Sequence, residues 1–303
     1  MSKILVVGAA NIDLVTRVAR CPKPGETLMG AGFQTFPGGK GANQAVAAAR
    51  LGAETYFAGC VGQDVFGEYL SENLANAGLH LTYLRKHSSQ PTGTAVILVA
   101  DNGENTIVVT PAANHGITPA DVEALKPLFP GLDAVLLQLE IRLDTVEATL
   151  DLARSSSVLS MLDAGPAQRV PDSLLQKADV VSPNETEAEA ITGVDVDSVD
   201  AAKRAAGKLH ELGAREVVLK LGARGALYSG QDTIHSPAFK VEAVDTTAAG
   251  DAFTAALALV WKQMDRAHAL RFANAAGALA TTVMGAQPSM PTRSAVDAFL
   301  QAH

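Results

Sequence analysis

The sequence is poor in cysteine, tryptophan and long apolar runs, and each shortage excludes a class of protein. Its two cysteines, Cys21 and Cys60, provide neither a disulfide framework nor the paired spacing of a metal site. We therefore expect ordinary reduced thiols and a cytoplasmic protein. No apolar run approaches the roughly 20 residues that cross a bilayer, and the run after Lys3 is too short for a signal peptide. We expect no membrane partner.

Blocks of lysine and arginine are absent too. The formal net charge is -8, which gives no sign of binding to nucleic acid or to an acidic membrane. Two common phosphate-binding motifs are also missing. Gly41, and not Ser or Thr, follows Lys40, so there is no Walker A motif, and no G-x-G-x-x-G follows the first predicted strand. Any phosphate site must therefore be local and of another kind.

What the sequence does contain is a regular alternation of strands and helices. Of its 303 residues 48% are hydrophobic, enough to bury a large α/β core. We predict strands at 3 to 10, 54 to 60, 133 to 139, 158 to 162, 179 to 181 and 216 to 220. We predict helices at 44 to 51, 66 to 77, 119 to 129, 144 to 155, 185 to 191, 200 to 212, 252 to 261, 266 to 283 and 292 to 301, and a hairpin near 226 to 244. This alternation is typical of a parallel sheet covered by helices on both faces.

The stretch from Asp245 to Phe253 stands out within this pattern. It follows an apolar, strand-like run ending at Val244 and opens into a helix. The backbone N–H groups of Ala248, Ala249 and Gly250 would lie unpaired at the positive end of that helix, where a phosphate or an oxyanion binds readily. Asp251 at the same end is either a reacting carboxylate or a plain helix-end acid.

Several polar or glycine-rich segments follow predicted strands. Parallel strands would gather them at one edge of the sheet, as a phosphoryl-transfer site needs. They are Asn11 with Asp13, the run from Pro37 to Asn43, Glu140, Asn184 with Glu187, and Gly222 to Gly225. Each has a plainer interpretation: Asn184 and Glu187 could cap a helix, the glycines could form hairpin turns, and Glu140 could lie on the surface.

These motifs together resemble the ribokinase-like carbohydrate kinase family over nearly the whole chain. The matching segments are Asn11-Ile12-Asp13, Gly38 to Ala45, Gln138-Leu139-Glu140, Pro183 to Glu187, Leu221 to Gly225, Val244 to Phe253 and Gly285 to Ser289. The resemblance implies a three-layer α/β/α domain over 1 to 303 with a β-clasp lid at about 12 to 38 and 92 to 112, and a homodimer paired through the lids. It implies transfer of phosphate from ATP to a primary hydroxyl of a pentose, with the 5-hydroxyl of D-ribose as the expected acceptor.

The resemblance also implies roles for individual residues. Asp251 would be the general base, and Ala248, Ala249 and Gly250 would form the anion hole. Asn11, Asp13, Gly39, Lys40, Gly41, Asn43, Glu140 and Asp251 would bind the sugar. Asn184, Glu187, Lys220, Gly222, Ala223, Gly225, Gly250 and Asn274 would contact the nucleotide, with Glu187 reaching Mg²⁺ through water. Asp245, Thr247, Ala280, Val283, Gly285 and Ser289 would hold a monovalent cation, K⁺, next to the anion hole.

Two departures and several alternatives remain open. Lys220 stands where the family often has Thr, and either adds a charge near the nucleotide phosphates or merely ends a strand. Ala112-Ala113-Asn114 replaces the common Gly-Ala-Asn. The alternative activities are phosphorylation of deoxyribose, a nucleoside or a ketohexose. A non-catalytic sugar-binding sensor is the alternative from another class.

Overall fold

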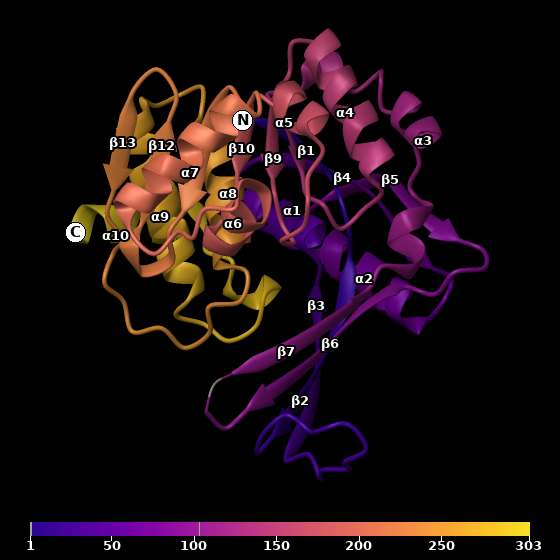
Figure 1. Ribbon diagram of the computed structural model, residues 1–303. Helices are drawn as coiled ribbons and strands as arrows, with labels where there is room; N and C mark the ends of the chain where they lie inside the picture. The colour runs from indigo at the N-terminus through magenta and orange to yellow at the C-terminus, as the bar shows by residue number, and fades with distance from the viewer. Residues whose placement is uncertain (1, 103) are drawn as a thin grey trace.

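The computed structural model describes residues 2–102 and 104–303, and within them the chain forms two sheets (Figure 1). The main sheet has nine strands in the order β13, β12, β11, β10, β9, β8, β1, β4, β5. They are β1 (Lys3–Val7), β4 (Glu54–Gly62), β5 (His80–His87), β8 (Ala134–Leu137), β9 (Leu159–Asp163), β10 (Val180–Ser182), β11 (Glu216–Lys220), β12 (Ala226–Ser229) and β13 (Thr233–Ser236). Neighbours from β11 to β5 pair in parallel, and only β12 and β13 at one edge are antiparallel. The predicted fold class, a mostly parallel α/β sheet, is confirmed.

Helices cover both faces of this sheet. Alternate residues of β1 enter two separate cores, Ile4 and Val6 on one face and Leu5 and Val7 on the other. The first face carries α1 (Lys40–Arg50), α2 (Val65–Asn76), α8 (Ala249–Val260), α9 (Arg266–Ala280) and α10 (Arg293–Ala302). The second carries α3 (Pro119–Glu123), α4 (Leu143–Ser155), α5 (Asp172–Lys177), α6 (Glu185–Thr192) and α7 (Val199–Glu211).

Helix α8 is the most buried of these helices. Every residue from Asp251 to Val260 is buried, because α1 and α9 pack against it. A helix that is apolar on all sides needs such cover. This packing holds the first turn of α8, and with it Asp251, at a fixed place above the sheet.

The second sheet has four strands in the order β3, β2, β6, β7 and projects from the main body (Figure 1). It consists of β2 (Asn11–Val18), β3 (Gly32–Gly38), β6 (Gly93–Ala100) and β7 (Asn105–Thr110). These strands use the segments that the sequence suggested for a lid; position 103, between β6 and β7 in the chain, lies outside the described residues. Every side chain of β7 is exposed.

Several predicted elements differ from the structure. The strand-like run before Asp245 is not a strand: residues 237 to 243 have no regular structure, and Val244 is exposed. The helix predicted for 119 to 129 ends at Glu123 and gives way to turns, because Pro127 cannot donate a backbone hydrogen bond inside a helix. Strand β5 and helix α5 were not predicted. No helix in the described part of the chain is long and apolar enough to span a membrane.

Candidate active site

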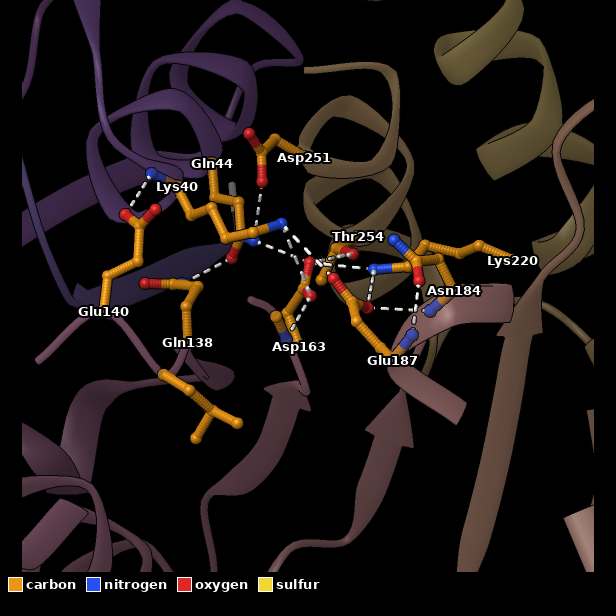
Figure 2. A network of polar contacts seen from close by, with 12 residues as sticks. Lys40, Gln44, Gln138, Glu140, Asp163, Asn184, Glu187, Lys220, Asp251 and Thr254 are labelled. Carbon is orange, nitrogen blue, oxygen red and sulfur yellow. Dashed lines mark hydrogen bonds and ion pairs between the residues drawn. The ribbon is translucent and has the colours of Figure 1, made fainter. Parts of the chain in front are cut away.

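Asp251 belongs to a polar cluster where the carboxyl ends of the parallel strands face the first turn of α8 (Figure 2). Its carboxylate is oriented by two side chains of α1: Asn43 Nδ2 donates to Oδ2 at 2.9 Å, and Gln44 Nε2 donates to Oδ1 at 3.1 Å. Asp251, Asn43 and Gln44 are all buried. The carboxylate is therefore held in one orientation and shielded from bulk water.

The backbone before Asp251 turns sharply into α8. Ala248 has a φ of 60° in the left-handed region, which costs an alanine about 1–3 kcal/mol. The N–H groups of Ala248 and Gly250 have no acceptor within residues 2–102 and 104–303, whereas Ala249 donates to the carbonyl of Thr246 at 3.3 Å. Two of the three expected N–H groups are thus free to bind an anion at a helix N-terminus.

Two more carboxyl groups lie close to Asp251. Asp13 of β2 packs against Gly38, where a Cβ would lie 2.3 Å from Asp13 Oδ2. Glu140, just after β8, accepts a hydrogen bond from the backbone N–H of Lys40 at 2.9 Å. Burial and then the charges of Glu140 and Asp251 raise the pKa of Asp13 to about 7. Burial raises the pKa of Glu140 to about 7 as well, although Lys40 opposes the shift.

The glycine-rich run packs the start of α1 against the end of β1. Gly39 has a φ of 90°, and a Cβ there would lie 2.8 Å from the Ala9 carbonyl oxygen. The close approach brings Lys40 and Asn43 into the cluster. Asn43 Oδ1 is buried without a hydrogen-bond partner in the described part of the chain, so a ligand hydroxyl is a suitable donor for it.

Lys40 is surrounded by carboxylates. Its Nζ lies 3.7 Å from Glu187 Oε1 and 4.0 Å from Asp163 Oδ1. Burial alone would lower the pKa of Lys40, but Asp163, Asp251, Glu187 and Glu140 together raise it above its ordinary value. Lys40 is therefore a permanent positive charge in the cluster.

Asn11 lies at the same edge of the sheet, and its side-chain oxygen is already hydrogen-bonded within the protein. Asn114 Nδ2 donates to Asn11 Oδ1 at 2.7 Å, and Asn114 Oδ1 accepts from the Ala10 N–H at 2.9 Å. Both asparagines are buried. In the structure Asn11 links the start of the second sheet to the short 3-10 helix Ala112–Gly116.

The residues expected to contact the nucleotide have structural roles in the protein itself, such as the helix cap and the turns that the sequence also allowed. Asn184 and Glu187 form a capping box on α6, in which Asn184 Oδ1 accepts from the Glu187 N–H at 2.8 Å. Gly222 and Gly225 have positive φ in a tight turn between β11 and β12, with Ala223 between them. Asn274 Nδ2 donates to Ser236 Oγ and the Ser236 carbonyl, both at 3.1 Å. All of these groups still lie around the carboxyl end of β11 or the segment that follows β13.

Sequence reasoning missed Asp163 and Gln44. Asp163 is fully buried at the end of β9, where it forms an ion pair with Lys220 Nζ at 2.9 Å and accepts hydrogen bonds from Gln44 Nε2 at 3.0 Å and Thr254 Oγ1 at 3.2 Å. Burial would raise the pKa of Asp163, but Lys220 and then Lys40 hold it below its ordinary value. The predicted strand stopped one residue short, at 162; a strand extended to Asp163 would have identified this residue by the same strand-end rule.

Of the residues expected to hold a monovalent cation, Thr247 and Gly285 contact Asp245. Asp245 Oδ1 accepts from the Thr247 N–H at 2.9 Å and Oδ2 accepts from the Gly285 N–H at 2.8 Å. Thr281, which follows Ala280, accepts from the backbone N–H of Asp245 at 3.0 Å. Burial alone would raise the pKa of Asp245, but these hydrogen bonds keep the pKa below its ordinary value. Val283 is exposed, and Ser289 donates to the Ala286 carbonyl.

Comparison with known proteins gives one consistent result. Residues 1–293 match the family sequence model of the pfkB family carbohydrate kinases. A ribokinase of Haemophilus influenzae is 41% identical over 98% of both chains, and a deoxyribokinase of Salmonella typhimurium is 36% identical over 98% of both. The structure of Arabidopsis thaliana ribokinase complexed with ribose and ATP superposes with a TM-score of 0.91 at 36% identity, covering 99% of both chains.

Proposed function

The chain belongs to the pfkB family of carbohydrate kinases, and we propose that it transfers the γ-phosphoryl group of ATP to the 5-hydroxyl of D-ribose. The products are D-ribose 5-phosphate and ADP. The observation that carries the proposal is the full-length similarity to proteins named ribokinase, including one solved with ribose and ATP. The arrangement around Asp251 supplies the chemistry that such a transfer needs.

Asp251 is the general base in this proposal. Its two hydrogen bonds from α1 leave further lone pairs of the carboxylate free to accept the proton of the sugar hydroxyl. Burial raises the pKa of Asp251, with Lys40 opposing the shift and Asp163 adding to it, which makes the carboxylate a stronger base than in water. The free N–H groups of Ala248 and Gly250 then stabilise the charge of the migrating phosphoryl group.

The sugar is held on the other side of Asp251. Asp13 and Glu140 offer carboxyl groups to its hydroxyls, and Asn43 offers the unpartnered Oδ1. Gly39 and Gly41 let the start of α1 pack closely against the backbone that follows β1. The positive charge of Lys40 offsets the negative charge of the carboxylates. Such a dense set of polar partners suits a small molecule that carries several hydroxyls.

Magnesium enters this proposal with the nucleotide. No three His, Cys, Asp or Glu residues in the described chain are placed to hold a metal ion together. This fits an ion that is bound mainly by phosphate oxygens and water, with Glu187 as the nearby carboxylate. Magnesium would neutralise charge on the phosphates.

Potassium is the second ion in the proposal. The ligands expected for it are the carboxylate of Asp245, which lies beside the Thr247 and Gly285 backbones, and the backbone carbonyl of Thr247. Oxygen ligands with one negative charge suit a large monovalent cation better than magnesium. Such an ion would offset the charge of Asp245 next to the anion hole and would fix the backbone of the Thr247 turn.

We also propose a cytoplasmic homodimer paired through the second sheet. This sheet exposes apolar side chains that a second copy of the chain would cover. They are Phe33, Val96, Ile107, Val108 and Val109. The two strands at its edges, β3 and β7, have free hydrogen-bonding groups that favour such cover.

A panel of sugars tests the substrate. D-ribose, 2-deoxy-D-ribose, D-fructose and nucleosides are compared with MgATP while ADP release is measured, and ³¹P NMR of the product identifies the phosphorylated hydroxyl. We expect the highest kcat/KM for D-ribose. A tenfold advantage for fructose or a nucleoside would overturn the assignment. The similarity to a deoxyribokinase makes 2-deoxy-D-ribose the second candidate, and a higher kcat/KM for that sugar would favour it.

A further inference from the structure

A single buried side chain connects the candidate base to a second carboxylate. Gln44 Nε2 donates to Asp251 Oδ1 at 3.1 Å and to Asp163 Oδ2 at 3.0 Å (Figure 2). The Gln44 carbonyl oxygen accepts from Gln138 Nε2, which fixes the orientation of the amide. Gln44, Gln138 and Asp163 have no exposed surface. Both N–H bonds of the Gln44 amide are used, one for each carboxylate. A displacement of the Asp163 side chain would therefore also move the Asp251 carboxylate.

Lys220 is the group that holds Asp163. Its Nζ lies 2.9 Å from Asp163 Oδ2, and only 9% of its side chain is exposed. Lys40 lies farther away, at 4.0 Å from the other oxygen. A buried carboxylate is costly without a close, hydrogen-bonded cation, so Lys220 is the main reason that Asp163 can stay ionised.

The charged groups that surround Asp251 come from six elements. They are Lys40 of α1, Asp13 of β2, Glu140 after β8, Asp163 of β9, Glu187 of α6 and Lys220 of β11. Of these groups, only Asp163 shares a hydrogen-bond donor with Asp251 among the described residues. Its negative charge adds to the rise in the pKa of Asp251, and Lys220 offsets that charge.

We propose that Lys220 and Asp163 are positioning residues, and that the buried chain from Lys220 through Asp163 and Gln44 orients the Asp251 carboxylate and keeps it ionised for proton transfer. This inference rests on the proposed kinase function. It also gives Lys220 a role that differs from both of the roles that the sequence left open for it. The side chain serves the base, through Asp163, instead of merely ending a strand.

A double-mutant cycle tests the proposal. We would measure kcat and the KM for ribose, at saturating MgATP, in Lys220→Met, Asp163→Asn and the double variant. Each single change leaves one buried charge without its nearest partner, so kcat should fall at least about tenfold with a KM change below about threefold. The double variant restores charge balance, and the amide oxygen introduced by Asp163→Asn can still accept from Gln44. Its kcat should return to within about fivefold of the wild type, whereas independent residues would give the product of the two losses.

A pH profile separates positioning from simple support of the fold. In Asp163→Asn the base loses a neighbouring negative charge and keeps Lys220, so the acidic limb of kcat should move to lower pH. Lys177→Met is the matched control, because this lysine also pairs with carboxylates, Glu147 and Asp151, but on the surface. It should leave kcat and its pH profile unchanged.

Two results would overturn the inference. One is a double variant whose kcat is the product of the single losses. The other is an Asp163→Asn variant in which the acidic limb of the kcat profile stays at the wild-type pH, while the coupling between Lys220 and Asp163 is seen only in thermal stability. Both are distinct from failure of the proposed function, in which the wild type itself would not phosphorylate ribose.

Discussion

Replacing Asp251 by asparagine separates the chemical role of this side chain from its structural role. The amide has nearly the same shape and still accepts the hydrogen bond from Gln44, but it cannot take a proton from a sugar hydroxyl. We expect kcat to fall by about 10²- to 10⁴-fold, the usual contribution of a general base. The affinity for ribose should change by less than about threefold, because Asp13, Asn43 and Glu140 are retained.

The same substitution should make the protein more stable at neutral pH. Asp251 raises the pKa of Asp13 and of Glu140, so its removal relieves repulsion among three buried or partly buried carboxyl groups. The pKa of Asp251 is itself raised above 3.8, so the folded state holds this proton more tightly than the unfolded chain. The wild type therefore loses stability as the pH rises from about 4 toward the folded-state pKa, and the Asp251→Asn variant avoids that loss. We expect a gain of about 1–3 kcal/mol above pH 7, shrinking to nothing near pH 4.

Three measurements check this prediction. Coupled ADP release gives kcat, calorimetry without nucleotide gives the ribose affinity, and thermal unfolding from pH 4 to 8 gives the change in stability. Asp144→Asn is the control for a plain helix-end acid, because Asp144 lies in the first turn of α4, where its exposed side chain pairs with Arg142, and the change should leave kcat unchanged. Near-normal turnover in Asp251→Asn would return Asp251 to that plain role. A loss of stability at pH 8 would refute the argument about charge crowding.

Two further predictions concern the cation and the lid. Potassium should activate the enzyme more than sodium at constant ionic strength, and Asp245→Asn should abolish the difference, whereas Asp265→Asn, which removes only the charge of the N-cap of α9, should keep it; equal rates in both salts would exclude the cation site. Val108→Glu on β7 should convert a sedimenting dimer into a monomer at micromolar concentration because it places a charge on the apolar surface, whereas Val65→Glu on α2 should not; a monomeric wild type would disprove the dimer.

The parts of the fold that the sequence predicted well are those whose apolar residues follow the regular spacing of a strand or a helix. The strand at Glu216–Lys220 and the helices around 143–155 and 199–211 appear within one residue of the predicted bounds, because their apolar patterns reflect burial directly. Strand β5 was missed because His80–His87 is a partly exposed edge strand rich in polar side chains, and only its pairing with β4 makes it a strand. The run before Asp245 failed for the opposite reason: it has a strand composition, but it pairs with no strand among residues 2–102 and 104–303.

The site shows a similar division. Glycine-rich turns and strand ends located Lys40, Asn43, Glu140 and Asp251, because each belongs to a segment whose local pattern is unusual. No local pattern identified the link from Gln44 to Asp163, since these residues are 119 positions apart and meet only through the packing of α1 against the sheet. Lys220 was conspicuous in the sequence, but its partner could be found only in three dimensions.

Charge balance at this edge of the sheet explains why the proposed reaction would depend on cations. The cluster contains the carboxyl groups of Asp13, Glu140, Asp163, Glu187 and Asp251, against the two ammonium groups of Lys40 and Lys220. A triphosphate adds negative charge to a site that already has too much of it, and the backbone N–H groups of α8 offer only partial charges in return. Magnesium on the phosphates and potassium at Asp245 would correct this imbalance from two sides. Lys220 reduces the imbalance within the protein itself, because its ammonium group offsets the charge of Asp163. Asp163 shares the donor Gln44 with Asp251, and no substrate hydroxyl is proposed to contact it.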